Sequence, residues 1–331
     1  MVAQWMQAAA WLADDPVSRV RLGQTPNTVI HRDGKAQLRY FAPTQATLPP
    51  VFCVMPLINT WTVFDLLPGR SVVETLVKAG APVYILDWGR AGPEDRHTPL
   101  AHYVDRVIGR CLSRACRHAS LPALPVLGYC VGGTFLAVHL ARSERRQASR
   151  ACFLATPVDF YASGRLSTWA RAETFPLDAL VDNLGNFPRE MMLDSFRWLR
   201  PTGLASKYKA LVDRGGDPGF RDLWAALEAW NNDGVDFPGE AYREYVRRCY
   251  FDNALVRGGW VMDGRPVDLG CATIPALALA ASDDHIVPPA AAFALAGAWG
   301  GPVATDTVKG GHVGVCASPR LPARLLEWLG S

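Results

Sequence analysis

The sequence predicts an α/β fold in which a mostly parallel central sheet carries helices on both faces. Two observations predict it: short apolar runs rich in β-branched residues recur along the chain, and helical spacing falls between them. The candidate strands are 37–41, 51–55, 83–86, 126–129, 151–155, 276–280 and 303–308, and the clearest helices are 71–78, 132–142, 290–298 and 320–329. Strands that are apolar throughout and alternate with helices are typical of a parallel sheet buried on both faces.

The first expected element is an amphipathic helix over residues 3–13, which we expect to lie on the domain or on a partner. Gln4 and Gln7 interrupt its apolar residues, and Asp14 and Asp15 follow where a signal peptide would have a cleavage site. No apolar run approaches the roughly 20 residues of a membrane span, so none is expected. The eight cysteines form no Cys-x-x-Cys pair, which favours reduced thiols and a cytoplasmic protein, without a bound metal.

The middle of the chain breaks the alternation of strands and helices. Residues 157–269 are rich in Trp, Phe, Arg and Asp and show helical spacing without comparable strands. We therefore expect one domain over 1–331, with a core over about 35–156 and 270–331 and a helical cap over 157–269. The 331 residues are 49% apolar and 20% charged, with a net charge of +3, so a large core is expected and a nucleic-acid partner is not.

The segment from Val126 to Gly133 contains the pattern Gly-x-Cys-x-Gly, with Cys130 at its centre. It follows an apolar strand directly and precedes a helical run directly. This is the arrangement of a nucleophile elbow, with Cys in place of the commoner Ser. The glycines allow close approach around a strained turn, and the helix N-terminus favours a thiolate. The pattern predicts that Cys130 is a nucleophile.

The chain then supplies an acid and a histidine in the order expected for the α/β-hydrolase fold. Asp284 follows the strand 276–280, and His312 follows the strand 303–308 between glycines. A carboxylate that orients a histidine, which in turn takes the thiol proton, activates a cysteine. His285 is a rival base, but it adjoins Asp284, and we expect it to play a supporting or structural part. We expect the other histidines to lie on the surface or on helices; they are His31, His97, His102, His118 and His139.

Together these motifs resemble the short-subunit (class III-like) polyhydroxyalkanoate synthases of the α/β-hydrolase superfamily, nearly from end to end. The resemblance covers the elbow at 128–133, the acid segment Asp284 to Pro288, and Gly311-His312. The other matching segments are 23–26, 56–59, 65–71, 83–89, 196–201, 230–233 and 237–242.

The resemblance implies that (R)-3-hydroxyacyl groups from coenzyme A thioesters are polymerised to a polyester, with release of coenzyme A. Cys130 is then the acylated residue and His312 its general base, while Asp284 assists His312 or helps to activate the incoming hydroxyl. The oxyanion donors are the backbone N–H of Val131 and one from the loop that contains Ile58 and Asn59.

No cofactor beyond the coenzyme A thioester is implied. The resemblance also implies a small accessory subunit and a homo- or hetero-oligomer. It further implies a cytoplasmic location that includes the surface of polyester granules.

One departure from the family pattern leaves alternatives open. After Asn59 the family has a basic residue and, two positions later, a Tyr, whereas this chain has Thr60, Trp61 and Thr62. A single-transfer acyltransferase or a thioesterase is therefore the second hypothesis, and a non-catalytic granule-binding protein the third. Aromatic residues of the cap are suited to excluding water, although we expect most of them to fill the cap's own core; they are Trp198, Trp224, Trp230, Tyr242 and Tyr245.

Overall fold

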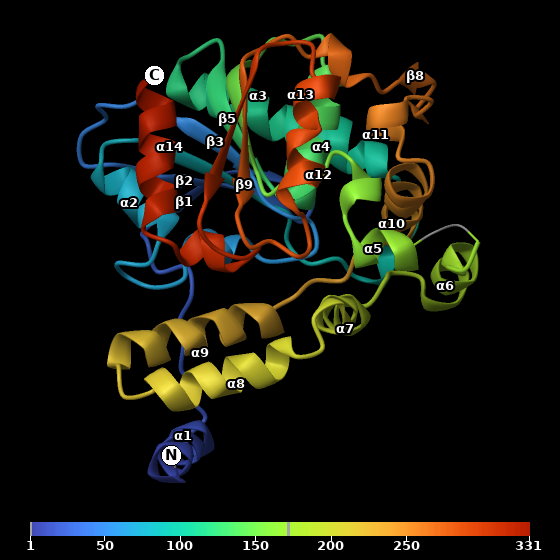
Figure 1. Cartoon of the computed structure of the whole chain (residues 1–331). Coiled ribbons are helices and arrows are strands. Elements are labelled where there is room, and N and C mark those ends of the chain that lie inside the picture. The colour runs from blue at the N-terminus through green and yellow to red at the C-terminus, as the bar shows by residue number, and fades with distance from the viewer. Residues whose placement is uncertain (1, 171–172) are drawn as a thin grey trace.

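The computed structural model describes residues 2–170 and 173–331. Its centre is an eight-stranded sheet in the order β1-β2-β4-β3-β5-β6-β9-β10 (Figure 1). The strands are β1 (Thr28–Asp33), β2 (Ala36–Phe41), β3 (Val51–Val54), β4 (Val83–Asp87), β5 (Leu124–Tyr129), β6 (Ala148–Leu154), β9 (Ala276–Ala281) and β10 (Val303–Val308). β2 pairs antiparallel with β1 and β4, and every other pair in this sheet is parallel. The predicted α/β fold is confirmed.

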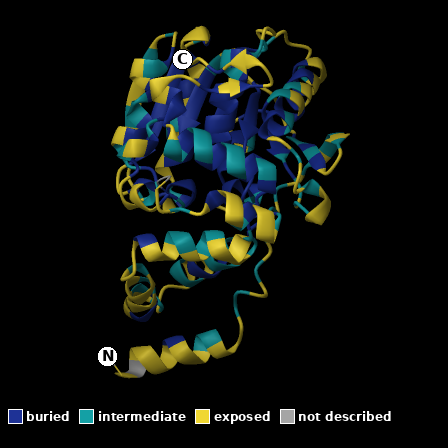
Figure 2. Ribbon diagram, turned by 90° about the vertical axis from the view of Figure 1, so that its right-hand side faces the viewer, coloured by how far each residue is buried: buried dark blue, intermediate teal, exposed yellow. Residues whose placement is uncertain are grey.

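Alternating side chains of the central strands divide the core into two layers. Phe52 and Val54 of β3 point into the layer with α3 (Ile108–Ala119) and α4 (Val131–Arg142). Val51 and Cys53 point the other way, into the layer with α2 (Val72–Lys78) and α14 (Arg320–Gly330). Because both faces are covered, the middle strands are apolar at every position. Figure 2 shows the buried residues concentrated in this part of the molecule.

The structure differs from the sequence analysis at several elements of the core. β1 lies before the expected start of the core near residue 35. It was not predicted because a strand at the exposed edge of the sheet tolerates polar residues, and β1 contains His, Arg and Asp. The segment 102–119, for which no helix was predicted, forms a π-helix, His102–Val107, that continues into α3. The single helix expected over 290–298 is two short ones, α12 (Pro289–Phe293) and α13 (Leu295–Ala298).

The segment expected as a cap is mainly helical. It contains α5 (Arg165–Trp169), α6 (Leu177–Leu184), α7 (Arg189–Leu199), α8 (Gly203–Arg214), α9 (Pro218–Asn232), α10 (Gly239–Tyr245) and α11 (Ala254–Arg257). A two-stranded hairpin of β7 (Val261–Met262) and β8 (Arg265–Pro266) also forms, with strands too short to produce a visible alternation. Residues 171–172 of the expected cap lie outside the described residues.

Helices α8 and α9 form a layer of their own beside the sheet, and α1 (Val2–Ala13) lies against α8 on the far side (Figure 1). Ala8 and Trp11 of α1 pack on Leu211 and Trp224, and the rings of Trp11 and Trp224 meet edge to face at 5.8 Å. The N-terminal helix is thus attached to the cap. Among the helices described, none combines the length and apolar character needed to cross a bilayer.

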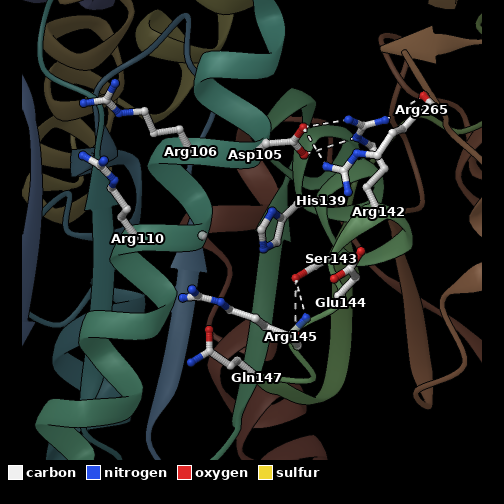
Figure 3. Close-up of a pocket in the computed structure, with 11 residues that line it drawn as sticks. Asp105, Arg106, Arg110, His139, Arg142, Ser143, Glu144, Arg145, Gln147 and Arg265 are labelled. Atoms are coloured by element: carbon white, nitrogen blue, oxygen red, sulfur yellow. Dashed lines mark hydrogen bonds and ion pairs between the residues drawn. The ribbon is translucent and has the colours of Figure 1, made fainter. Parts of the chain in front are cut away.

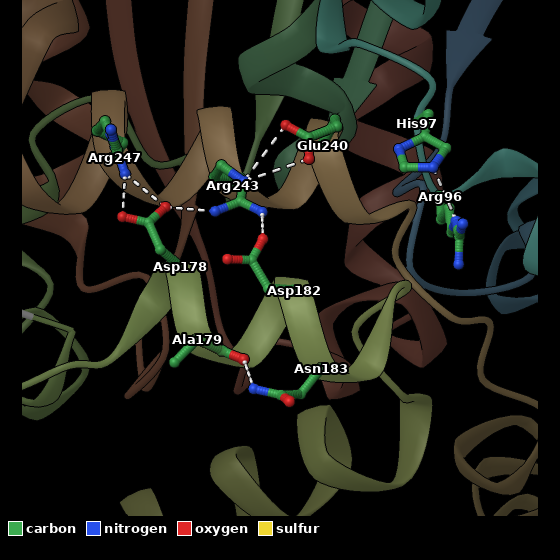
Figure 4. Close-up of polar contacts among 9 residues, drawn as sticks. All are labelled: Arg96, His97, Asp178, Ala179, Asp182, Asn183, Glu240, Arg243 and Arg247. Carbon is green, nitrogen blue, oxygen red and sulfur yellow. Dashed lines mark hydrogen bonds and ion pairs between the residues drawn. The ribbon is translucent and has the colours of Figure 1, made fainter.

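Ion pairs attach α6 to α10 at the edge of the cap (Figure 4). Arg243 of α10 binds Asp178 and Asp182 of α6, and it also contacts Glu240 one turn earlier at 3.3 Å. Arg247 binds the same Asp178 at 2.7 Å. The side chain of Arg243 is only 19% exposed, so it is the central member of this network.

Candidate active site

Cys130 occupies the turn between β5 and α4 in a strained backbone conformation. Its φ is 52° and its ψ is −132°, in a region that residues with a side chain rarely adopt. The Cys130 N–H donates to the Leu154 carbonyl at 3.0 Å, and the Cys130 carbonyl accepts from Gly133 N at 2.9 Å. These bonds hold the strained residue between the neighbouring strand and the first turn of the helix, and the Cys130 side chain lines a cavity.

The glycines around Cys130 are required by close backbone packing. A Cβ on Gly128 would collide with the backbone of Gly133, and one on Gly132 would collide with the carbonyl of Met55. A Cβ on Gly133 itself would collide with the hydroxyl of Thr156. The Gly-x-Cys-x-Gly-Gly pattern therefore allows the first turn of α4 to lie directly against β3 and the end of β6.

His312 and Asp284 form a buried hydrogen-bonded pair at the carboxyl ends of β10 and β9. Nδ1 of His312 lies 2.6 Å from Oδ2 of Asp284, and both residues are buried. The other oxygen, Oδ1, accepts the N–H groups of Ile286 and Val287 at 2.9 and 2.8 Å. Because the carboxylate engages Nδ1, the Nε2 atom of His312 is left for the proton of a reacting group.

The electrostatics of the site favour a protonated His312. Burial alone lowers the pKa of His312, but the Cys130 side chain and then the Asp284 carboxylate outweigh it and raise that pKa to about 10. An imidazole with this pKa is protonated at neutral pH. The arrangement is chemically suited to a cysteine nucleophile whose histidine partner shuttles protons.

Tyr129 fixes the loop that carries His312. Its hydroxyl donates to the backbone carbonyl of His312 at 3.0 Å, and the two rings stack with centroids 5.5 Å apart. Sequence analysis missed this residue, although it lies next to Cys130. Tyr129 and His312 are 183 positions apart in the sequence, and a local sequence pattern cannot predict a hydrogen bond between residues so far apart.

The residues expected to form the oxyanion site lie near Cys130, and their role stays a prediction. Val131 is the first residue of α4, where the N–H groups have no partner within the helix. Ile58 and Asn59 line the same cavity as Cys130, and the Ile58 carbonyl accepts from Val235 N at 3.1 Å. That bond joins the loop after β3 to the segment that follows α9.

The departure after Asn59 has a structural explanation. Thr60 and Thr62 hydrogen-bond to each other through their hydroxyls at 2.9 Å. Trp61 is buried against Phe41, with ring centroids 5.6 Å apart. Trp230 of α9 donates from Nε1 to the Thr60 carbonyl at 2.9 Å, so an aromatic residue of the cap holds this loop in place.

A cavity of about 870 Å³ lies above Cys130 and His312, between the core loops and the helices α7, α8 and α9. Its wall includes the apolar side chains Met192, Phe196 and Trp198. Four basic residues also line it: Arg189, Arg197, Arg200 and Lys207. Three of them pair with carboxylates that line the same cavity, namely Glu190, Asp194 and Glu228. The volume falls in the range of small-molecule sites, and the apolar part of the wall suits an acyl chain.

His285 lies on the wall of this cavity, exposed, and not behind His312. Partial burial of its ring lowers the pKa of His285, and this effect outweighs the Asp284 carboxylate, which raises the pKa. Of the five cap aromatics, Trp198 and Trp230 line the cavity. Trp224 packs on α1, while Tyr242 and Tyr245 are buried among Phe187, Phe237 and Phe135. Only Trp224 therefore fills a core of the cap itself, and the expectation that most of the five would do so is wrong: Tyr242 and Tyr245 join the core layer that contains α4.

Comparison with known proteins places this architecture in a class. A family model described as the alpha/beta hydrolase fold matches residues 65–314. Among solved structures, a bromoperoxidase from Bacillus anthracis superposes with a TM-score of 0.55 over 92% of this chain and 99% of its own, at 16% identity. A proline iminopeptidase from Mycobacterium smegmatis gives 0.51 at 14% identity. These likenesses show the fold, and the chain is a member of the α/β-hydrolase class.

Curated relatives narrow the class to one family. The poly(3-hydroxyalkanoate) polymerase subunit PhaC of Synechocystis sp. is 32% identical, covering 94% of this chain and 85% of its own length. The subunit from Allochromatium vinosum is 31% identical, covering 93% and 88%. That from Haloferax mediterranei is 30% identical, covering 96% and 67%. The chain belongs to the family of PhaC subunits of poly(3-hydroxyalkanoate) polymerases.

Proposed function

We propose that the protein polymerises (R)-3-hydroxyacyl groups from coenzyme A thioesters and releases coenzyme A. The observation that carries this proposal is the placement of Cys130 at a strained elbow, beneath a cavity, beside a His312 that Asp284 orients at 2.6 Å. Family membership supplies the class of reaction. No cofactor is required, because the thioester substrate itself carries the activated acyl group.

The first step is transfer of the acyl group to the enzyme. In this scheme the proton of the Cys130 thiol already lies on Nε2 of His312 before substrate binds, and the sulfur attacks the thioester carbonyl. The carbon–sulfur bond to coenzyme A breaks, and the departing thiolate takes the proton from His312. The N–H of Val131 and one N–H from the loop of Ile58 and Asn59 stabilise the oxyanion in this proposal.

The second step forms the ester bond. The 3-hydroxyl of an incoming (R)-3-hydroxyacyl-CoA loses its proton to His312 and attacks the acyl carbon on Cys130. The carbon–sulfur bond to Cys130 breaks, and the thiol regains a proton, which leaves an acyl-CoA longer by one unit. Return of this acyl group to Cys130 releases coenzyme A and completes one cycle of growth.

Asp284 acts on His312 and not on the hydroxyl in this scheme. Its two oxygens are already engaged, one by His312 and the other by the N–H groups of Ile286 and Val287. A carboxylate bound in this way holds the imidazole in one tautomer and stabilises its protonated form.

Partners and location belong to the same proposal. A water-insoluble polyester grows beside the enzyme, so we place the protein in the cytoplasm at the surface of granules. The side chains of Trp5 and Met6 on α1 are 51% and 68% exposed and suit contact with an apolar surface. From the resemblance we also propose a small accessory subunit within an oligomer.

The test is incubation of the purified chain with (R)-3-hydroxybutyryl-CoA, followed by mass analysis of the products. Wild type is expected to give ester-linked oligomers and free coenzyme A, and Cys130→Ala neither, because no thioester to the enzyme can form. The matched control is Cys271→Ala, which removes an exposed cysteine that does not line the cavity and is expected to leave oligomer formation unchanged.

Free 3-hydroxybutyrate without oligomers would contradict polymerisation and favour the single-transfer enzyme. Oligomers of equal yield from Cys130→Ala would exclude Cys130 as the nucleophile.

A further inference from the structure

A second cavity, separate from the active site, lies beside the C-terminal end of α4 (Figure 3). Its volume is about 360 Å³. Its lining comes from the start of α3, the last turn of α4, the turn at 143–147 and Arg265 of β8. His139 of this cavity and Cys130 are nine positions apart at the two ends of one helix, which corresponds to roughly 14 Å at about 1.5 Å per residue. The catalytic proposal does not use this cavity.

The lining of this second cavity is strongly basic. Five arginines contribute to it, namely Arg106, Arg110, Arg142, Arg145 and Arg265, against two carboxylates, Asp105 and Glu144. On one side of the cavity the positive charge is partly balanced by Asp105. Its carboxylate accepts two hydrogen bonds from Arg142, of 3.2 and 2.8 Å, and lies 3.8 Å from Arg265.

The other side of the cavity has unbalanced positive charge. Arg106 and Arg110 share the single carboxylate of Asp33, at 3.6 and 3.2 Å. Arg145 contacts the Ser113 hydroxyl at 3.3 Å, and no carboxylate among the described residues pairs with it. Figure 3 shows the Arg106, Arg110 and Arg145 guanidinium groups on one side of His139, opposite the Asp105 cluster. With Glu144, which also lines the cavity, two carboxylates therefore stand against these three positive groups.

His139 contributes a buried ring to the wall of the cavity. The residue is 5% exposed, and its ring lies over Gly109, where an added Cβ would be 3.2 Å from Cε1. Burial lowers the pKa of His139 to about 4, so the ring is neutral at pH 7. Its Nδ1 atom is covered by protein, so a molecule in the cavity would lie beside the ring without bonding to that atom.

We propose that this cavity binds a small phosphorylated molecule, whose phosphate oxygens accept hydrogen bonds from Arg106, Arg110 and Arg145 beside the His139 ring. Planar guanidinium groups match the geometry of phosphate oxygens, and several of them together suit a group with three or more acceptors. The volume is within the range of small-molecule sites and leaves room for an organic part beside the phosphate. The site is independent of the proposed polymerase activity.

The experiment uses the full chain and inorganic pyrophosphate as the probe. Calorimetry measures binding, and nitrogen NMR of labelled histidines reports on His139. Pyrophosphate is expected to shift the His139 ring signals, since a strong negative charge comes to lie beside the ring. Arg145→Gln and Arg106→Gln are each expected to weaken this binding roughly tenfold or more, because each removes a charge-assisted hydrogen bond. Both side chains are exposed, so the variants are expected to fold.

Two controls separate this site from other cationic surfaces. Arg114→Gln changes an exposed arginine of the same helix that does not line the cavity, and it is expected to leave binding unchanged. Arg200→Gln changes the cavity above Cys130 and is expected to leave the His139 shift unchanged. The proposal is overturned if saturating pyrophosphate leaves the His139 signals in place, or if Arg145→Gln and Arg106→Gln both bind as the wild type does.

Discussion

At the scale of single residues, the active site divides its tasks between backbone and side chains. The backbone positions Cys130, the proposed nucleophile, at a positive φ that costs about 1–3 kcal/mol. The Asp284 carboxylate positions His312, the proposed base, and two backbone N–H groups position that carboxylate in turn. Both side chains are therefore already oriented without substrate, which is what the proposed mechanism requires.

The pair of His312 and Asp284 gives a prediction that depends on pH. Asp284→Asn removes the negative charge that helps to raise the pKa of His312 to about 10, so that pKa is expected to fall. Wild-type His312 then keeps its proton until the pH rises toward 10, whereas the variant releases it at lower pH. NMR titration of the His312 ring measures this directly, and polymer formation is expected to fall roughly 10³- to 10⁴-fold.

The adjacent Asp283→Asn is the matched control for this variant. Asp283 is exposed and bonds only to the hydroxyl of Ser282 among the side-chain partners described, at 3.0 Å. It is expected to leave the His312 titration and the activity unchanged. An Asp284→Asn protein whose His312 titrates as in wild type would show that the carboxylate does not hold the imidazole.

Among single residues, the sequence predicts the roles that depend on position in the chain and misses those that depend on packing. Cys130, Asp284 and His312 could be predicted to lie at one edge of the sheet because each comes within four residues after a parallel strand, and such strand ends converge. Tyr129 and His139 could not, since their contacts or burial depend on segments far away in the sequence. His139 was expected on the surface or on a helix; it is on a helix, but it is buried.

At the scale of elements, the contact between α4 and the sheet depends on the absence of side chains. Gly133→Ala is expected to destabilise the protein by about 1–3 kcal/mol, because the new Cβ overlaps Thr156. Activity is expected to fall as well, because Cys130 directly precedes the first turn of α4 and is displaced when that turn moves away from Thr156. Thermal unfolding and product formation measure the two effects.

Gly297→Ala in α13 is the control, since an added Cβ there meets nothing within 4 Å. It is expected to be neutral or to stabilise the protein by up to about 1 kcal/mol, as Ala favours helix over Gly. Equal unfolding temperatures for the two glycine variants would contradict the packing argument.

The ion-pair network between α6 and α10 gives a prediction about local stability. Arg243→Met removes the contacts to Asp178, Asp182 and Glu240, so hydrogen exchange in α6 is expected to quicken. Global stability is expected to change little, because exposed ion pairs contribute about 0–1 kcal/mol each. Arg248→Met, which removes one pair within its own segment at 3.1 Å, is expected to leave α6 unchanged. Exchange in α6 that is equally fast in both variants would contradict the role of Arg243.

Elements also differ in how visible they are in sequence. The buried central strands are conspicuous because every position is apolar. The helix that begins at Ile108 was missed, although Arg106, Arg110, Arg114 and Arg117 recur at helical intervals. The arginines lie on the face opposite a regular apolar stripe of Ile108, Cys111, Leu112, Ala115 and Cys116. Both the apolar and the charged spacing were therefore available signals, and the charged face also leads to the second cavity.

At the scale of the whole molecule, the sequence predicted two layers of helices around a sheet and a helical insertion. It could not predict how the insertion lies on the sheet, because that arrangement depends on contacts between distant segments. Trp230 bonds to the loop after β3, Val235 bonds to Ile58, and α1 packs on Trp224. The first two of these connections join the loop after β3 to the segments beside the cavity above Cys130.

The two outer strands of the sheet have a consequence for how copies of the protein meet. An outer strand offers unpaired N–H and C=O groups to any similar strand, which favours aggregation. β1 has a bulge between Val29 and His31 and ends with Arg32 and Asp33, while Asp306 of β10 pairs with Arg324. Edge strands that contain a bulge or charged side chains pair poorly with the edge strand of another copy. Self-association is therefore expected through helical surfaces, and the protein is expected to resist the β-type aggregation that open sheets invite.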